Sequence, residues 1–154
     1  MEFSQPADEH KRLEKLIGNW AGPETMSPSP WDPEGGTAEG RITNKGVCAG
    51  FGVVQDYEQI RDGAVSFSGH GIFTWEASQK RYMMHWWDSM GFPPNVFSGD
   101  FEGDVLIMQC EGPEGHHRVS VDLSKDNAYE FKMEVSSDGA KWDTFLVGSY
   151  VRQA

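Results

Sequence analysis

Residues 64–88 read AVSFSGHGIFTWEASQKRYMMHWWD and predict a β-hairpin. Large apolar residues alternate with small or polar ones in both halves of this stretch, which is typical of strands with one buried face. If the loop near Ala77 and Ser78 has an even number of residues, odd positions of the first strand share a face with even positions of the second. We therefore expect one inner wall built from Phe67, Phe73, Trp75, Tyr82, Met84 and Trp86, ending in Asp88.

The same register places two histidines, His70 and His85, near each other on the outer wall. Two imidazoles can bind a metal ion or form an acid–base pair, but the sequence supplies no third ligand beside them. We therefore expect two exposed histidines and no metal site. His116 and His117 are neighbours on another predicted strand, so they point to opposite faces.

A second hairpin is predicted towards the C-terminus. Residues 117–123 and 129–135 alternate apolar and polar side chains, and the turn-forming residues 124–127 join them. Further strands are predicted at 36–46, 49–60, 96–101, 104–111 and 141–151, and one begins at Trp20.

Only residues 6–17 have helical character, with Leu13, Leu16 and Ile17 on one face and Gly18 as the stop. About ten consecutive strands without a helical crossover predict a meander, and a meander of that size best avoids exposed edges by closing on itself. The predicted fold is all-β: one domain over residues 1–154, a closed antiparallel up-and-down barrel with a short N-terminal helix. A β-sandwich is the alternative.

Charge excludes two classes of partner. The chain has 24 acidic and 13 basic residues, and its net charge of -11 repels nucleic acids and anionic membrane surfaces. No apolar run is long enough to span a membrane, and the charged residues before Gly18 do not fit a signal peptide. Cys48 and Cys110 are far apart in sequence, which favours two reduced thiols and a cytoplasmic location.

Several motifs resemble known barrel families. Leu16-Ile17-Gly18-Asn19-Trp20 looks like the Gly-x-Trp opening of calycin barrels, the group that contains lipocalins. The runs at 67–71, 82–91 and 149–152 (FSGHG, YMMHWWDSMG and SYVR) resemble the bacterial DUF1579 family, whose function is uncharacterised. This resemblance implies a lipocalin-like fold and no established activity. It also implies a structural contact in which Arg152 stacks on Trp20.

Haem is the one cofactor that a related group suggests. Nitrobindins begin similarly and bind haem through a histidine on a late strand. Residues 142–154 contain no histidine, and His117 lies on an earlier strand. We therefore expect neither haem nor another cofactor.

The leading functional hypothesis is a binding protein for a small, largely apolar ligand inside the barrel. Ten strands enclose more space than the eight that side chains fill closely, which favours a cavity over a packed core. Asp88 and His117 are the candidate contacts for the polar end of the ligand. The expected aromatic lining consists of Phe67, Phe73, Tyr82, Trp86, Tyr129 and Phe131.

Alternatives from other classes remain open. One is an enzyme that uses Asp88 as a general base, although no catalytic motif is present. Another is a barrel that acts through its surface or as a homodimer. Asp88 has a structural interpretation too, in which it ends a strand and accepts hydrogen bonds from the backbone of residues 89–91. The stretches Pro23–Gly36, which contains Trp31, and Gly91–Val96 are candidates either to cap an open end or to be plain loops.

Overall fold

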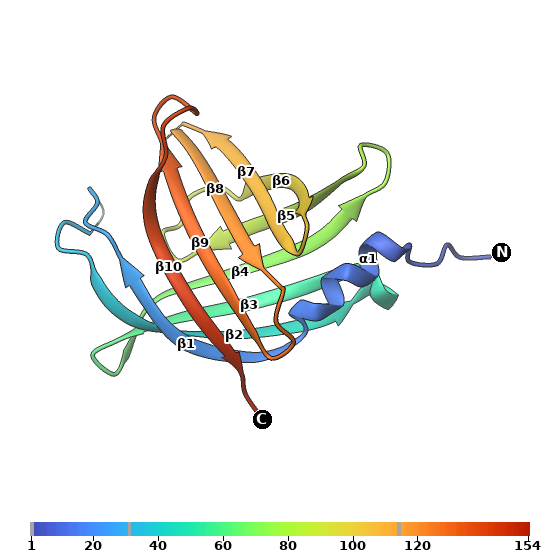
Figure 1. Cartoon of the computed structure of the whole chain (residues 1–154), viewed down its shortest axis with the longest axis horizontal. Helices are drawn as coiled ribbons and strands as arrows, with labels where there is room; N and C mark the ends of the chain where they lie inside the picture. Colours follow the sequence, from blue (N-terminus) through green and yellow to red (C-terminus); the bar gives the residue numbers. More distant parts are fainter. Residues whose placement is uncertain (1, 31, 114) are drawn as a thin grey trace.

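The computed structural model describes residues 2–30, 32–113 and 115–154, and within these ranges it is a closed barrel of ten antiparallel strands (Figure 1). Consecutive strands are neighbours, and β1 pairs with β10 to close the wall. The predicted meander is confirmed, and the sandwich alternative is wrong. The strands are β1 (Gly18–Met26), β2 (Gly36–Val47), β3 (Gly52–Arg61), β4 (Ala64–Glu76), β5 (Arg81–Asp88), β6 (Asn95–Glu102), β7 (Val105–Gly112), β8 (Gly115–Asp122), β9 (Ala128–Ser136) and β10 (Asp143–Arg152).

The β4–β5 hairpin has the register expected from the sequence. β4 and β5 are joined by residues 77–80, an even number, and Phe73 pairs with Met84 while Trp75 pairs with Tyr82. Odd positions of β4 and even positions of β5 therefore share the inner face, as predicted. His70 and His85 both lie exposed on the outer face.

The expected strands agree with the structure to within two residues at each end except at the start of β3, and the expected helix differs in form. The helical segment is α1 (Asp8–Arg12) followed by a 3-10 turn, η1 (Leu13–Leu16), rather than one helix over 6–17. β3 begins at Gly52 rather than at 49, because Cys48 and Ala49 have positive φ angles of 52° and 55° and form a tight turn, η2 (Cys48–Gly50).

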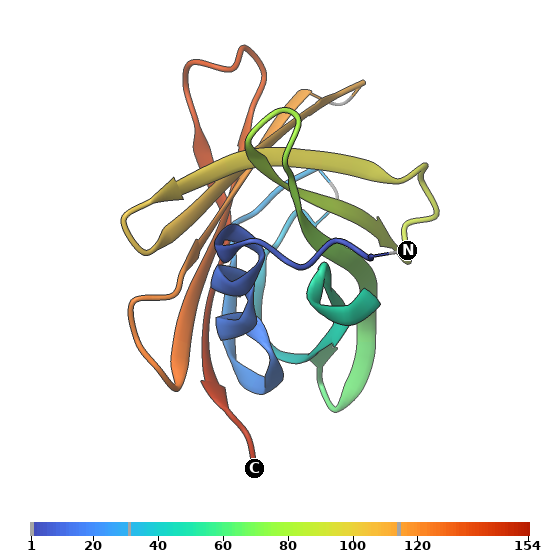
Figure 2. The ribbon, with the colours of Figure 1, turned by 90° about the vertical axis from the view of Figure 1, so that its right-hand side faces the viewer.

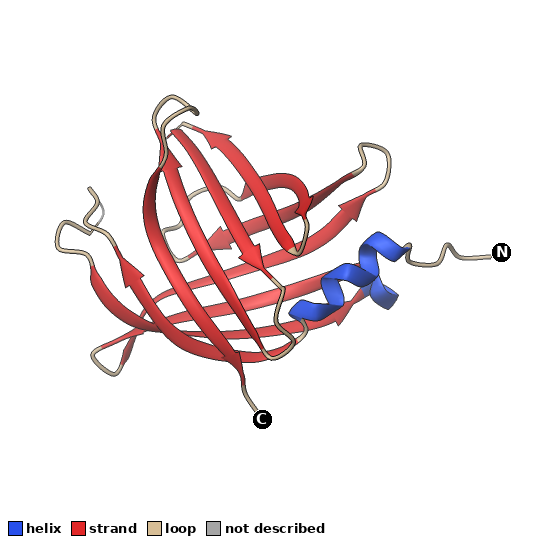
Figure 3. Ribbon diagram, in the orientation of Figure 1, coloured by secondary structure: helices blue, strands red, loops and turns tan. Residues whose placement is uncertain are grey.

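The segment α1–η1 covers one end of the barrel, as Figure 2 shows. Leu13 and Leu16 are each 1% exposed because they pack into the core at that end. The phenol of Tyr82 donates a hydrogen bond to the carbonyl of Glu9 at 2.7 Å, which ties the helix to the wall. At the opposite end, the described chain forms only loops (Figure 3).

The contact implied by the calycin resemblance is present at the closing seam. Trp20 pairs with Arg152, and the guanidinium carbon of Arg152 lies 4.3 Å from the centroid of the Trp20 ring. Arg152 also donates to the carbonyl of Ile17 at 2.7 Å. Trp20 itself donates from Nε1 to the carbonyl of Leu16 at 2.8 Å. Hydrogen bonds from Trp20 and Arg152 therefore join the β1–β10 seam to the end of the helical segment.

No helix in the described ranges is both long and apolar enough to cross a lipid bilayer.

Candidate functional site

The barrel interior divides into two halves that differ in exposure. The helix-covered half contains inward-facing side chains that are at most 5% exposed, among them Trp20, Ile42, Val53, Phe73, Tyr82, Leu106, Val121 and Tyr129. The open half contains inward-facing side chains that stay half-buried, among them Tyr57, Arg61, Phe67, Trp86, Asp88, His117, Phe131 and Met133. The inner wall is therefore more open to solvent at the end that α1 does not cover.

Aromatic rings form one wall of the open half. The centroid of the Tyr57 ring lies 6.1 Å from that of Phe67 and 6.3 Å from that of Trp86. The Trp86 indole lies against β4, where a Cβ at Gly69 or Gly71 would meet the ring. The two glycines of the FSGHG motif therefore make room for this indole, which gives the motif a physical reason.

Asp88 holds the Trp86 ring in place. Its Oδ2 accepts from Nε1 of Trp86 at 2.9 Å, and its Oδ1 accepts from the backbone N–H of Met90 at 3.0 Å. These contacts fit the structural interpretation of Asp88, since both carboxylate oxygens are occupied. The polar-end and general-base roles for Asp88 stay predictions.

The other predicted lining residues are divided between the open half and the helix-covered half. Phe67, Phe131 and Trp86 face inward in the open half, and His117 lies on the inner face of β8 opposite Cys110 and Val135. Phe73 and Tyr82 lie in the helix-covered half, as does Tyr129, and pack against other core residues. For these three residues, contact with a ligand stays a prediction that their burial does not support.

A buried polar cluster, which the sequence argument missed, lies beneath the aromatic wall. Glu24 is 1% exposed and accepts hydrogen bonds from the phenol of Tyr57 at 2.7 and 2.8 Å and from Nε2 of Gln59 at 3.2 Å. The phenol of Tyr150 also donates to Glu24. Gly40 leaves room for this cluster, because a Cβ there would meet both Glu24 and Tyr150. The parity of β1 was the available signal, since Glu24 shares the inward face with Trp20.

The cluster holds its tyrosines in the neutral form. Burial, followed by the negative charge of Glu24, raises the pKa of Tyr57 and of Tyr150 far above the ordinary value for tyrosine. Neutral phenols donate hydrogen bonds but do not act as bases. Titratable groups do converge inside the barrel, as an enzyme would require. Two of them, Tyr57 and Tyr150, are however neutral and donate to the buried carboxylate of Glu24.

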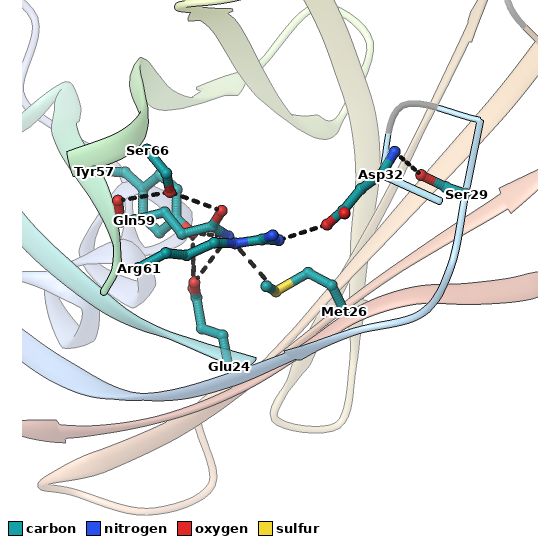
Figure 4. Close-up of polar contacts among 8 residues, drawn as sticks. All are labelled: Glu24, Met26, Ser29, Asp32, Tyr57, Gln59, Arg61 and Ser66. Atoms are coloured by element: carbon teal, nitrogen blue, oxygen red, sulfur yellow. Dashed lines mark hydrogen bonds and ion pairs between the residues drawn. The ribbon is translucent and has the colours of Figure 1, made fainter. Parts of the chain in front are cut away.

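A cation and a loop meet at the rim of the open half. Arg61 ends β3 on the inner face and forms an ion pair with Asp32, with Nη2 and Oδ2 2.6 Å apart (Figure 4). Asp32 belongs to the connection between β1 and β2, which is shorter than the predicted 23–36 because β1 continues to Met26. The predicted cap contains Trp31, which lies outside the described residues.

Two open hollows lie on the outside of the barrel, and charged side chains contribute to the lining of both. One, of about 310 Å³, lies beside α1 and is lined by Lys11, Arg12 and Asp104, among others. Another, of about 400 Å³, lies against β1–β3 and is lined mainly by polar residues such as Arg41 and Glu58. Both are open and charged, unlike the aromatic wall inside.

The predicted outer histidines, His70 and His85, are both described and do not contact each other. His70 Nδ1 instead lies 2.7 Å from Oδ1 of Asp56 on the neighbouring strand. In the described part of the chain, no three His, Cys, Asp or Glu side chains are grouped to hold a metal ion. Cys48 and Cys110 are both free thiols, the first exposed and the second buried.

Comparison with known proteins supports the fold and identifies no activity. Residues 5–152 match the model of the family described as "Protein of unknown function (DUF1579)". No curated protein matches the sequence. The crystal structure of Rv2717c from M. tuberculosis is similar, with a TM-score of 0.68 at 15% identity over 96% of this chain and 99% of that one. The S-type phycobiliprotein lyase CPES from Guillardia theta has a TM-score of 0.62 at 11% identity, over 97% and 99%. Identities this low show a shared fold alone.

Proposed function

Since the chain belongs to the DUF1579 family, whose function is unknown, we propose its function from its own side chains: it binds a small, largely apolar ligand in the open half of the barrel. One observation carries the proposal. Aromatic residues that face the inside of the closed barrel stay partly exposed at the end that α1 does not cover, whereas α1 packs over the other end. Exposed apolar surface in a concave, preformed wall is the usual setting for a small-molecule site.

The wall suits a flat or extended apolar body. Tyr57, Phe67 and Trp86 offer ring faces and edges, and Phe131 and Met133 line the same half from β9. The Glu24 cluster beneath them is polar but already saturated with donors, which supports recognition of an apolar body rather than of a deep polar group. His117 remains a proposed polar contact on the β8 side.

A binding protein fits these contacts better than an enzyme does. The proposed general base, Asp88, is occupied by the Trp86 indole and the Met90 backbone. Tyr57 and Tyr150 have raised pKa values, so they stay protonated near neutral pH and do not act as general bases there. The proposal includes a cytoplasmic location, which the two free thiols support.

The test uses N-phenyl-1-naphthylamine, a neutral probe whose emission rises in apolar surroundings. We expect saturable binding by the full chain, accompanied by a change in tryptophan emission. Phe67→Ala removes part of the wall and should weaken binding about tenfold, the effect of losing about 1.4 kcal/mol of contact.

Val65→Ala is the matched control, because Val65 lies on the same strand but is 55% exposed. It should leave the affinity unchanged. Absence of saturable binding, or an equal loss with both variants, would count against a site in the open half.

A second candidate function has one observation in its favour, an exposed apolar group on the β5–β6 hairpin. Trp87, Met90, Phe92 and Val96 are between 42% and 59% exposed, and we call them the hairpin patch. A patch of this kind suits self-association as a homodimer. Sedimentation at rising concentration should then show dimers that Trp87→Ser abolishes and Val151→Ser, on the other rim, does not. A monomer throughout would remove this candidate.

A further inference from the structure

Arg61 has an unused donor at the rim of the proposed site. Its Nη2 bonds to Oδ2 of Asp32, while its Nε is buried and has no hydrogen-bond partner. A buried N–H without an acceptor costs free energy, so such groups are rare in folded proteins. The side chains of Arg61 and Asp32 are 28% and 25% exposed, so both are reachable from the open end.

Another arginine of this chain, Arg118, uses both Nε and Nη2 as donors to one carboxylate. In Arg118, Nε and Nη2 each donate at 3.0 Å to a different oxygen of Glu134, which is the side-on, two-bond arrangement. Asp32 accepts only from Nη2 of Arg61, so one of the two donors on this side of the guanidinium, Nε, stays without a partner. A carboxylate that approached Arg61 side-on would satisfy both donors.

Charge places such a carboxylate at the rim and not deeper. Glu24 is buried among uncharged partners, and its negative charge opposes a second anion at the base of the open half. Among the described inward-facing residues of the open half, Arg61 is the one lysine or arginine. An amphiphile would therefore lie with its apolar body on the Phe67 and Trp86 wall and its head group at Arg61.

We propose that the natural ligand carries a carboxylate, which replaces Asp32 on Arg61 and accepts from Nε and Nη2 together. This inference rests on the proposed function and names the chemical class of its ligand. Asp32 lies in the β1–β2 connection, where its N–H bonds to Ser29 Oγ at 3.0 Å, so the exchange breaks the ion pair between this connection and β3. In this structure, Asp32 holds the position on Arg61 that the head group of the ligand would take.

The experiment compares decanoate with decanol as competitors of N-phenyl-1-naphthylamine. These competitors share an apolar chain and differ in charge at the head. We expect decanoate to bind the wild type more tightly than decanol. Arg61→Gln should weaken decanoate about tenfold, and Asp32→Asn, which removes the internal competitor, should strengthen it by a similar factor. Neither variant should change the affinity for decanol.

Arg41→Gln is the matched control, because Arg41 pairs with Glu39 on the outer surface. It should leave both competitors unaffected. Equal affinities of decanoate and decanol, or a loss of decanoate binding with Asp32→Asn, would overturn the carboxylate assignment while the apolar site stands. Failure of the neutral probe itself would instead remove the proposed function.

Discussion

Phe67 and Phe73 lie on one strand, face the same interior and end in different surroundings. Phe73 is 3% exposed in the helix-covered half, whereas Phe67 is half-buried in the open half. Both residues lie on β4 between β3 and β5, so the difference in their exposure comes from what covers each end of the barrel. Leu13 and Leu16 fill one end from outside the sheet. The covered end of this barrel is therefore filled by the helical segment in addition to the side chains of its own strands.

The largest expected effect comes from truncating the two phenylalanines. Phe73→Ala should lower the free energy of unfolding by about 3–5 kcal/mol, because it leaves a cavity in a packed core. Phe67→Ala should cost less than about 2 kcal/mol, because solvent can enter the space that it leaves. Urea denaturation measures both.

The reverse result for probe binding sharpens the comparison. Phe73→Ala should leave the affinity for N-phenyl-1-naphthylamine unchanged wherever the variant is folded, although it is the more destabilising change. Equal costs of unfolding for the two variants would mean that the open half is as tightly packed as the covered half.

A second effect tests the boundary between the halves, where Tyr57 of the open half and Tyr150 share Glu24, and Tyr150 packs against Tyr129 of the helix-covered half. Burial raises the pKa of all three, with the charge of Glu24 adding to the rise. Above about pH 10 the unfolded chain loses these protons and the folded chain keeps them, so stability falls as pH rises. Each residue should contribute about 1.4 kcal/mol per pH unit.

Denaturation at several alkaline pH values, followed by phenolate absorbance, measures this slope. Tyr150→Phe should remove one residue's share of it, and Phe131→Leu should not change it. Phenolate absorbance that develops before the chain unfolds would show that solvent reaches the boundary, and the division into two halves would then fail.

The smallest effect concerns the seam beneath the covered half. Arg152→Ala removes the cation from the Trp20 face and should lower the free energy of unfolding by about 0.5–2 kcal/mol. Arg41→Ala, whose ion pair is exposed, should change it by less than about 0.5 kcal/mol. Thermal melts compare the two, and probe binding in the open half should be the same for both. An unchanged melting temperature for Arg152→Ala would contradict a structural role of the stack.

Periodicity of two was enough to predict the walls of the barrel from the sequence. It placed β4 and β5 residue for residue and assigned their inner faces, because alternation fixes a face once the loop length has even parity. It did not predict which inward aromatics would be sealed. Tyr82 and Trp86 lie four residues apart on one face, and only their distance from α1 separates a core residue from a site residue.

Polar partners across the interior were harder to foresee. Glu24 meets Tyr150 from the far end of the chain, and Arg61 meets Asp32 across a loop. Both contacts depend on strand tilt and on closure of the wall, which local sequence does not encode. Parity alone would have placed Glu24 and Arg61 on the inner face and so marked them as unusual charged residues there.

An even number of strands has a practical result for handling this protein. A meander of ten described strands begins and finishes at one rim, where the N–H of Gln153 bonds to the carbonyl of Asn19 at 2.7 Å. That rim is the one that the helical segment covers. Attachment chemistry placed after Ala154, such as a biotin for surface immobilisation, would therefore leave the open half, which carries the proposed site, facing the solution and away from the support.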